Sequence, residues 1–193
     1  SRNAEPVSML ESVRLMGNFM HHRGPDAWGE WVNDGVVLGH NRLAILDIDG
    51  GQQPMFSSTG NEVIVYNGEI YNFQEIRRQV LHDGGFLRTD HSDTEAIIEG
   101  YRLWGTSLFS RLNGMFAFAI WNIRDRSLIL VRDRVGIKPL YYARLADGGL
   151  AFASEPKALV GSGVIPARLD EGSVEGYFLF RSPLDPGTMF RGV

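Results

Sequence analysis

The sequence has no cysteine among its 193 residues, which excludes disulfide bonds, thiolate metal ligands and a cysteine nucleophile within the chain. It also lacks a long hydrophobic run. The longest extends from Met115 to Trp121, whereas a membrane-spanning helix needs about 20 apolar residues. The first residues show no apolar stretch of a signal peptide, and no Asn-x-Ser/Thr glycosylation site occurs. These absences favour a cytoplasmic protein without a membrane partner.

Clustered positive charge is missing too. The formal net charge is −4, and the Lys and Arg residues are scattered along the chain, so the basic face of a nucleic-acid-binding protein is not expected. The glycine-rich phosphate-binding motifs and the G-x-S-x-G nucleophile motif are absent as well. Nucleotide chemistry is therefore expected in another part of the protein. The hydrophobic fraction of 44% and the charged fraction of 22% are typical of a globular domain.

The hydrophobic pattern predicts strands in runs and helices in separate groups. Helices are expected over residues 8–20, after Asn72, over 93–103 and over 174–180, and strands over 36–38, 43–46, 63–66, 115–123, 127–132, 140–143 and 150–153. Turns are expected at 49–51 and 147–149. Because strand and helix do not alternate, the order predicts an α+β fold with antiparallel pairing.

The first candidate for chemistry is Asn67-Gly68, where the strand over residues 63–66 is expected to end. Asn-Gly is typical of turns with positive φ, which present backbone N–H groups on their concave side. An Asn side-chain amide and a neighbouring N–H aimed at one point would form an oxyanion hole. The alternative is a tight turn that leads into a helix capped by Asn72.

Two charged residues have both a binding and a structural interpretation. Arg42 lies inside an apolar stretch, between Leu38 and the run over residues 43–46. An arginine in a mostly buried strand needs an anionic partner, which could be a substrate carboxylate or a protein carboxylate such as Asp26 or Asp47. Asp93 stands with Asp90 and Glu95 at the front of a helix. It could cap that helix or hold an ammonium group of a ligand.

Metal and phosphate sites are not favoured. His21 and His22 are adjacent and would point in different directions, and the other histidines are scattered, so no metal site is predicted. The segment Arg132–Pro139 is dense in charge and could bind phosphate. Asp133 within it favours internal pairing instead.

Taken together, the segments resemble one family. They are His22–Asp26, Asn41–Leu43, Gly50–Met55, Asn67–Asn72, Ser92–Glu95, Gly114–Ala119, Arg132–Tyr142 and Phe152–Glu155. In this order they are similar to the class II glutamine amidotransferase domain of glutamine-dependent asparagine synthetases. The resemblance runs from about Leu10 to Val160 and more loosely to Val193. It implies an amidotransferase domain over residues 1–160 and, over 161–193, an extension or linker toward an absent synthetase domain.

The resemblance implies a fold and a set of roles. The fold would be of the N-terminal-nucleophile hydrolase type, a four-layer α/β/β/α sandwich with two antiparallel sheets. Asn67 and Gly68 would form the oxyanion hole. Arg42 would bind the α-carboxylate of glutamine, and Asp93, with Glu69 beside it, would hold the α-ammonium group. No metal or cofactor is expected in this domain, since ATP and Mg²⁺ would belong to the synthetase domain.

The implied activity is a glutaminase that supplies ammonia for the ATP-dependent amidation of aspartate by a synthetase domain of the same or a partner chain. A homo-oligomer is compatible with this expectation. In the family the nucleophile is an N-terminal cysteine whose own α-amino group acts as the base. This chain has no cysteine, so as given it is expected to be inactive. The alternative is a catalytically silent module that binds glutamine or has only a structural role.

Overall fold

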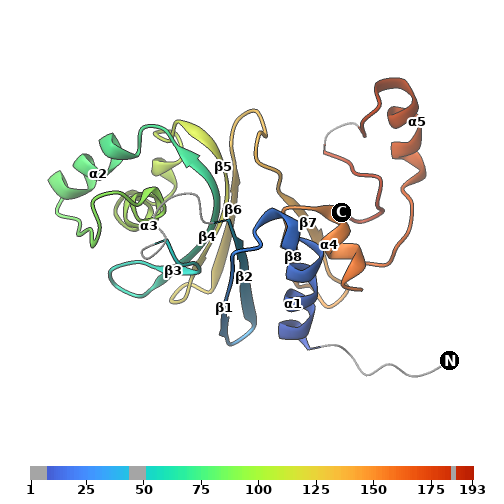
Figure 1. The fold of residues 1–193 in the computed structure, drawn as a ribbon, viewed down its shortest axis with the longest axis horizontal. Helices are drawn as coiled ribbons and strands as arrows, with labels where there is room; N and C mark the ends of the chain where they lie inside the picture. Colours follow the sequence, from blue (N-terminus) through green and yellow to red (C-terminus); the bar gives the residue numbers. More distant parts are fainter. Residues whose placement is uncertain (1–7, 44–50, 184–185) are drawn as a thin grey trace. The chain divides into compact units, whose positions relative to one another are not determined.

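The computed structural model describes residues 8–43, 51–183 and 186–193, which form two compact units (Figure 1). The first unit comprises the described residues of Ser1–Arg23, Asn33–Val37 and Leu140–Val193. The second comprises those of Gly24–Val32 and Leu38–Pro139. All five residues with predicted roles belong to the second unit.

The second unit is built on a four-stranded antiparallel sheet with the order β3-β4-β5-β6. Its strands are β3 (Met55–Phe56), β4 (Glu62–Ile70), β5 (Gly114–Asn122) and β6 (Ser127–Arg132). The two central strands, β4 and β5, pair along their whole length, from Glu62 opposite Asn122 to Ile70 opposite Gly114. Each central strand carries a run of buried residues, which accounts for their nearly continuous apolar sequences.

One face of this sheet packs against helices α2 (Phe73–His82) and α3 (Asp93–Trp104), and a short 3₁₀ turn, η2 (Gly105–Leu108), follows α3. Side chains alternate between the two faces of a strand. Ile64, Tyr66 and Ile70 of β4 therefore share the face of the helices, and all three belong to the main hydrophobic core. Val63 and Val65 are buried on the opposite face.

The hairpin of β1 (Ala27–Asn33) and β2 (Val36–Arg42) also contacts this sheet. The Trp31 ring of β1 meets the Phe56 ring of β3 edge to face, with 5.8 Å between the ring centroids. From β2, His40 Nε2 donates to the carbonyl oxygen of Tyr66 over 3.1 Å. The last part of β2 is thereby placed beside β4.

The first unit contains the antiparallel pair β7 (Tyr141–Arg144) and β8 (Leu150–Ala153), joined across the turn expected at residues 147–149. Its helical elements are α1 (Met9–Phe19), η1 (His21–Arg23), α4 (Pro156–Gly161) and α5 (Glu171–Phe180). The core of this unit is small, with alanines from β7, β8 and α4 packed around Leu159. Ser8 begins α1 with a capping box, in which Glu11 is the second partner.

The prediction of helices and strands is confirmed for most elements and wrong at some. The strands over 127–132 and 150–153 lie where the sequence placed them. The sequence did not indicate β1, β3 or α4. The strand expected over 43–46 and the turn expected over 49–51 fall mostly outside the described residues, in which Leu43 lies beyond the end of β2.

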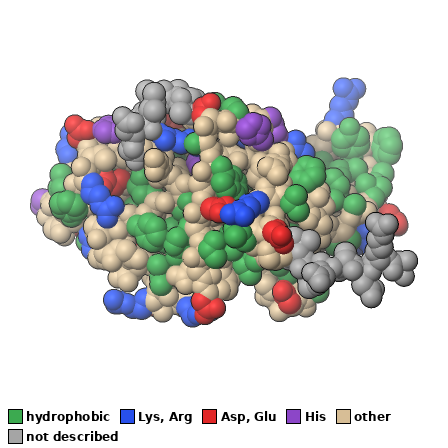
Figure 2. All heavy atoms as spheres, turned by 60° about the horizontal axis from the view of Figure 1, so that its bottom comes forward, with side chains coloured by type: hydrophobic (Ala, Val, Ile, Leu, Met, Phe, Trp, Pro, Cys, Tyr) green, Lys and Arg blue, Asp and Glu red, His purple; other side chains and the backbone are tan. Residues whose placement is uncertain are grey.

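The described part of the chain bears on the expectations about membrane-spanning helices, metal sites and a basic surface. No helix there is long and apolar enough to cross a membrane, and no group of three or more His, Asp or Glu side chains there could hold a metal ion. On the face shown in Figure 2, positive and negative side chains are interspersed and do not gather into a basic patch. The domain boundary expected after residue 160 stays a prediction.

Candidate active site

Strand β4 carries three of the predicted site residues, and the expectation that it ends at Asn67-Gly68 is wrong. The strand continues to Ile70, with Asn67 opposite Ala117 and Gly68 opposite Phe116 in β5. Glycine is needed at position 68 because the two strands approach closely. A Cβ atom there would overlap the Met115 carbonyl oxygen and lie 2.7 Å from Phe116 Cα. The Asn-Gly pair therefore marks a tight strand contact, not a turn.

The register shows where the Gly68 amide points. The backbone N–H of Phe116 donates to Asp133 Oδ2 over 3.2 Å, and its carbonyl accepts from Asp133 N over 2.8 Å, so both groups face away from β4. In an antiparallel ladder this makes Gly68–Phe116 a non-hydrogen-bonded pair. The N–H and C=O of Gly68 consequently face the other edge of β4, beyond the end of the two-residue strand β3.

The two residues that flank Gly68 on this edge are both held. Tyr66 N donates to Gln53 Oε1 over 2.6 Å, while Gln53 Nε2 donates to the Tyr66 carbonyl oxygen over 3.1 Å. At the other side, Ile70 N donates to Asp93 Oδ2 over 3.2 Å. Among the described residues, the Gly68 N–H has no such partner. It is an open donor between two fixed peptide groups, which is the geometry an oxyanion hole requires.

Asn67 and Glu69 point to the face of β4 opposite the helices, because side chains alternate along a strand. Asn67 is partly buried, and its amide makes no hydrogen bond to any described residue. Glu69 is exposed at the end of the strand. Its negative charge contributes to the raised pKa of the Tyr66 hydroxyl, after burial and Asp93.

Asp93 does not cap α3. Ser92 is the N-cap residue, and its hydroxyl accepts a hydrogen bond from Glu95 N. Asp93 Oδ2 instead accepts from the Tyr66 hydroxyl over 2.7 Å and from Ile70 N. Within the described chain Oδ1 takes no hydrogen bond, so this oxygen can accept from a cationic ligand. Burial and then the Asp93 charge raise the pKa of Tyr66, which keeps its phenol protonated.

Arg42 ends β2, two residues after His40. Its backbone carbonyl accepts from Asp26 N over 3.0 Å, and its charge acts on His40. Desolvation lowers the pKa of His40 to about 4, against the raising effect of its bond to Tyr66 and with a further lowering by Arg42. With a pKa of about 4, His40 is neutral near pH 7. Its proton is on Nε2, because the Tyr66 carbonyl can only accept.

Sequence reasoning missed the part that Gln53 and His40 play around Tyr66. Gln53 belongs to the segment Gly50–Met55 and has no role assigned to it there, and His40 counts only among the scattered histidines. A polar residue that bonds a backbone group of a distant strand leaves no periodic signal in a single sequence. The one available hint was a histidine two residues after the apolar run Val36–Leu38 of β2.

The charged segment after β6 has a structural role, as its sequence favoured, but the hydrogen bonds of Asp133, Arg132 and Arg134 go to backbone groups. The Asp133 carboxylate accepts from the backbone N–H groups of Phe116, Val135, Ile137 and Lys138. Burial raises the pKa of Asp133, but these four donors outweigh it and the pKa is lowered. Asp133 therefore fixes Phe116, which is the residue opposite Gly68.

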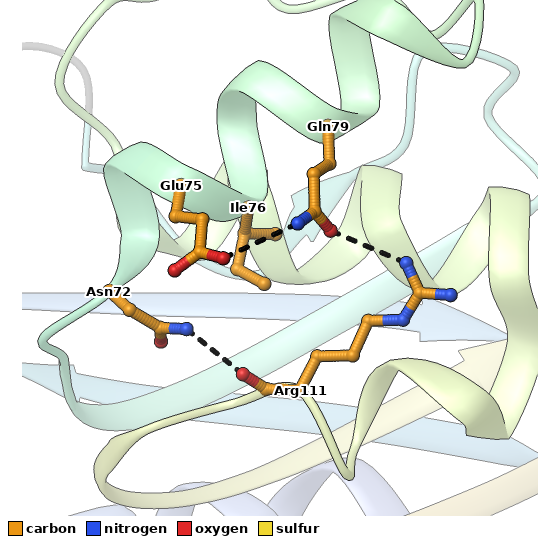
Figure 3. A pocket seen from close by; sticks show the side chains of 5 residues that line it. All are labelled: Asn72, Glu75, Ile76, Gln79 and Arg111. Atoms are coloured by element: carbon orange, nitrogen blue, oxygen red, sulfur yellow. Dashed lines mark hydrogen bonds between the residues drawn. The ribbon is translucent and has the colours of Figure 1, made fainter.

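A separate pocket of about 340 Å³ lies between α2 and the segment that carries Arg111, and none of the five predicted residues lines it (Figure 3). It is lined by Asn72, Glu75, Ile76, Gln79 and Arg111. Asn72 Nδ2 donates to the Arg111 carbonyl, and Arg111 Nη1 donates to Gln79 Oε1. Because none of the residues with a predicted role lines this pocket, it is not the site of the predicted chemistry.

Comparison with known proteins gives a consistent assignment. The profile of the family described as "Glutamine amidotransferase domain" matches residues 2–193. Asparagine synthetase [glutamine-hydrolyzing] 3 of Bacillus subtilis is 38% identical over 191 residues, which are 97% of this chain and 31% of that protein. Asparagine synthetase B [glutamine-hydrolyzing] of Escherichia coli is 36% identical over 156 residues, 81% of this chain and 28% of that protein. The chain thus spans less than a third of the length of these relatives.

Among solved structures, the glutamine phosphoribosylpyrophosphate amidotransferase of Bacillus subtilis superposes with a TM-score of 0.59 over 79% of this chain and 41% of that one, at 20% identity. This likeness shows the fold alone. It confirms the predicted α+β class with antiparallel sheets, of the N-terminal-nucleophile hydrolase type. With the family profile covering nearly all of its length, the chain belongs to the glutamine amidotransferase domain family.

Proposed function

We propose that the domain binds L-glutamine beside the β4 edge and supports the hydrolysis of its side-chain amide to glutamate and ammonia. The observation that carries the proposal is the open Gly68 N–H between the two held residues Tyr66 and Ile70, next to an Asn67 amide without a partner in the described chain. Together they provide two neutral donors for the oxygen of a carboxamide. Such donors gain strength as negative charge develops on that oxygen.

The α-ammonium and α-carboxylate groups of glutamine would bind to side chains of opposite charge in the same unit. Asp93 Oδ1 would accept from the α-ammonium group, while Oδ2 stays bound to Tyr66 and Ile70. Exposed Glu69 adds negative charge near the end of β4. Arg42 would bind the α-carboxylate, since guanidinium and carboxylate can form two parallel hydrogen bonds.

The reaction proposed for these groups is attack of a thiolate on the side-chain carbonyl carbon. The carbonyl oxygen becomes an oxyanion that Asn67 and Gly68 stabilise, ammonia leaves with the proton that the base supplies, and water then hydrolyses the thioester. The 193 residues contain no cysteine, so the thiol is not among them. Asn67 and Gly68 contribute by stabilising the tetrahedral intermediate, and Arg42 and Asp93 by orienting the substrate.

In the whole protein, we propose that the ammonia is used by a synthetase domain to form asparagine, as the names of the relatives suggest. We further propose that ATP and Mg²⁺ belong to that domain. The cytoplasmic location and a homo-oligomeric state stay predictions. Glu155 is the last residue of the segment Phe152–Glu155, which is part of the family resemblance. It belongs to the first unit, where it forms ion pairs with His22, Arg23 and Lys157, and the proposal gives it no role.

The proposal is tested by titrating L-glutamine into the chain by calorimetry. The wild type should bind, and Arg42→Ala and Asp93→Asn should each weaken binding about 10- to 100-fold, as expected for a lost charge-assisted hydrogen bond. Arg124→Ala and Asp125→Asn are the matched controls, because both residues are exposed near the β5–β6 turn and lie outside the proposed site. Absence of binding by the wild type, or equal binding by all variants, would contradict the proposal.

A further inference from the structure

The Gln53 side chain occupies a special position relative to β4. Strand β3 pairs with β4 through Met55 opposite Ile64 and Phe56 opposite Val63. Continuing this antiparallel register by two residues brings Gln53 opposite Tyr66. No backbone pairing extends that far, because β3 begins at Met55. The side-chain amide of Gln53 instead makes the two hydrogen bonds that a strand residue would make with its backbone.

This substitution is chemically apt because a primary amide has the same donor and acceptor as a peptide group. Gln53 Oε1 accepts from Tyr66 N over 2.6 Å, and Gln53 Nε2 donates to the Tyr66 carbonyl over 3.1 Å. The same carbonyl also accepts from neutral His40 of β2. The N–H and the C=O of Tyr66 are therefore both hydrogen-bonded at the edge of β4, beyond the point where its pairing with β3 ends.

The main chain of Gln53 is itself closely held. Gly29 of β1 lies so near that a Cβ atom on it would overlap the Gln53 carbonyl oxygen. A side chain at position 29 would thus displace Gln53 from its place against Tyr66. Gln53 is therefore constrained in two ways. Its main chain packs against β1, and its side chain is hydrogen-bonded to β4.

We propose that Gln53 is a positioning residue for the oxyanion-stabilising segment. It fixes the peptide group that joins Tyr66 to Asn67, and so sets the direction of the Asn67 side chain and of the Gly68 N–H that follows. This inference rests on the proposed glutaminase function for its kinetic consequence. Its structural consequence, the placement of the Gly68 amide by a residue that does not touch it, is independent of turnover.

The kinetic test compares Gln53→Met, which keeps the length and loses both hydrogen bonds, with Gln52→Met. Gln52 is the adjacent residue of the same type, and it is exposed. In the full-length protein, with glutamine as substrate, Gln53→Met should lower kcat about tenfold and change KM less than about twofold. The oxyanion forms during the reaction and is absent from the bound substrate, and complete removal of an oxyanion donor costs about 100- to 1,000-fold. Gln52→Met should match the wild type.

A merely structural role would give a different pattern. A kcat for Gln53→Met within twofold of the wild type, or one that falls only in step with the folded fraction measured by circular dichroism, would overturn the inference. If Gln53→Met does not fold, Gln53→Asn replaces it. The shorter amide cannot reach both Tyr66 atoms, and it should show the same fall in kcat at nearly constant KM.

A second readout separates this inference from the proposed function. In ¹⁵N-labelled chain, Gln53→Met should shift the amide resonance of Gly68 and speed hydrogen exchange at Tyr66, while Gln52→Met should leave both unchanged. If the full-length wild type does not hydrolyse glutamine, the proposed function fails and these spectra alone decide the role of Gln53. An unshifted Gly68 resonance in a folded Gln53→Met variant would overturn the positioning role, whatever the activity.

Discussion

The Tyr66 hydroxyl donates a 2.7 Å hydrogen bond to Oδ2 of Asp93, which joins the middle of β4 to the first residue of α3. The same carboxylate oxygen accepts from Ile70 N, so one side chain of the helix holds the strand on both sides of Gly68. Ser92 takes over the capping of α3, which leaves the Asp93 carboxylate available for these contacts. The helix start and the proposed oxyanion donor are thereby coupled.

This coupling predicts the effect of Tyr66→Phe. The ring stays in the core, but the carboxylate loses a donor, and a hydrogen bond to a charged group contributes about 1.5–3 kcal/mol. We expect the free energy of unfolding in urea to fall by about 2 kcal/mol and glutamine binding to weaken several-fold. Tyr142→Phe is the control, because Tyr142 is 57% exposed in β7. Unchanged glutamine affinity in Tyr66→Phe would show that Asp93 does not depend on Tyr66 for its position.

Gly68→Ala should be more damaging than an ordinary surface change in a strand. The added Cβ would meet the Met115 carbonyl oxygen and Phe116 Cα, both backbone atoms of the partner strand. We expect β4 and β5 to separate locally, at a cost of about 1–3 kcal/mol in unfolding free energy, together with loss of glutamine binding. Gly172→Ala provides the comparison, since a Cβ there would meet only Asp170 Oδ1, at the ordinary contact distance of 3.6 Å. Full binding by Gly68→Ala would contradict the close strand contact.

His40 predicts a pH dependence of stability. Its pKa is about 4 in the folded chain, with 6.5 as its ordinary value, so the unfolded state takes up the proton first as the pH falls. The free energy of unfolding should therefore decrease between pH 6.5 and pH 4, by up to about 3 kcal/mol. His40→Gln keeps a donor for the Tyr66 carbonyl without titrating, so its stability should be flatter in this range.

Urea denaturation at several pH values measures this effect, with His82→Gln as the control because His82 is exposed at the end of α2. The control should keep the full pH dependence of the wild type. A His40→Gln variant that loses stability between pH 6.5 and 4 as steeply as the wild type would show that His40 does not cause it.

Asp133→Asn should destabilise the sheet at neutral pH. The carboxylate accepts four backbone N–H groups, and an amide would offer one oxygen and direct its own N–H groups toward the other donors. We expect a loss of about 3 kcal/mol at pH 7. Because the pKa of Asp133 is lowered on folding, the advantage of the wild type should shrink as the pH falls below the ordinary value of 3.8. A difference that does not change with pH would contradict the charge-based explanation.

How far the sequence predicts this molecule is clearest at Asn67-Gly68. The residue types at this position indicated a candidate oxyanion hole. Local propensity also predicted a turn there, whereas the structure has a continuous strand. The reason is tertiary: Gly68 is small because β5 passes close by, and that information lies in residues 115 and 116. A similar lesson holds for Asn72, which begins α2 as expected but bonds Arg111 and Asn113 instead of capping the helix.

The buried strands of the four-stranded sheet were easier to predict than its edges. Apolar runs such as residues 115–121 report burial directly, and Ser127–Arg132 was placed as the structure has it. Strand β3, in contrast, has only two residues. Beyond it, the side chain of Gln53 takes the place of strand backbone in bonding β4. The support around the candidate site, formed by Gln53, His40 and Asp133, depends on contacts between segments distant in the chain, which no periodicity encodes.

The most direct test of the account is an NMR titration that follows the Gly68 amide of the ¹⁵N-labelled chain. L-glutamine should shift this resonance progressively as it binds, because its side-chain carbonyl accepts from the Gly68 N–H. L-norvaline has the same α-amino and α-carboxylate groups but no amide, so it should perturb the surroundings of Arg42 and Asp93 and leave Gly68 nearly unchanged. A Gly68 resonance that responds equally to both ligands, or to neither, would contradict the assignment of β4 as the oxyanion-binding strand.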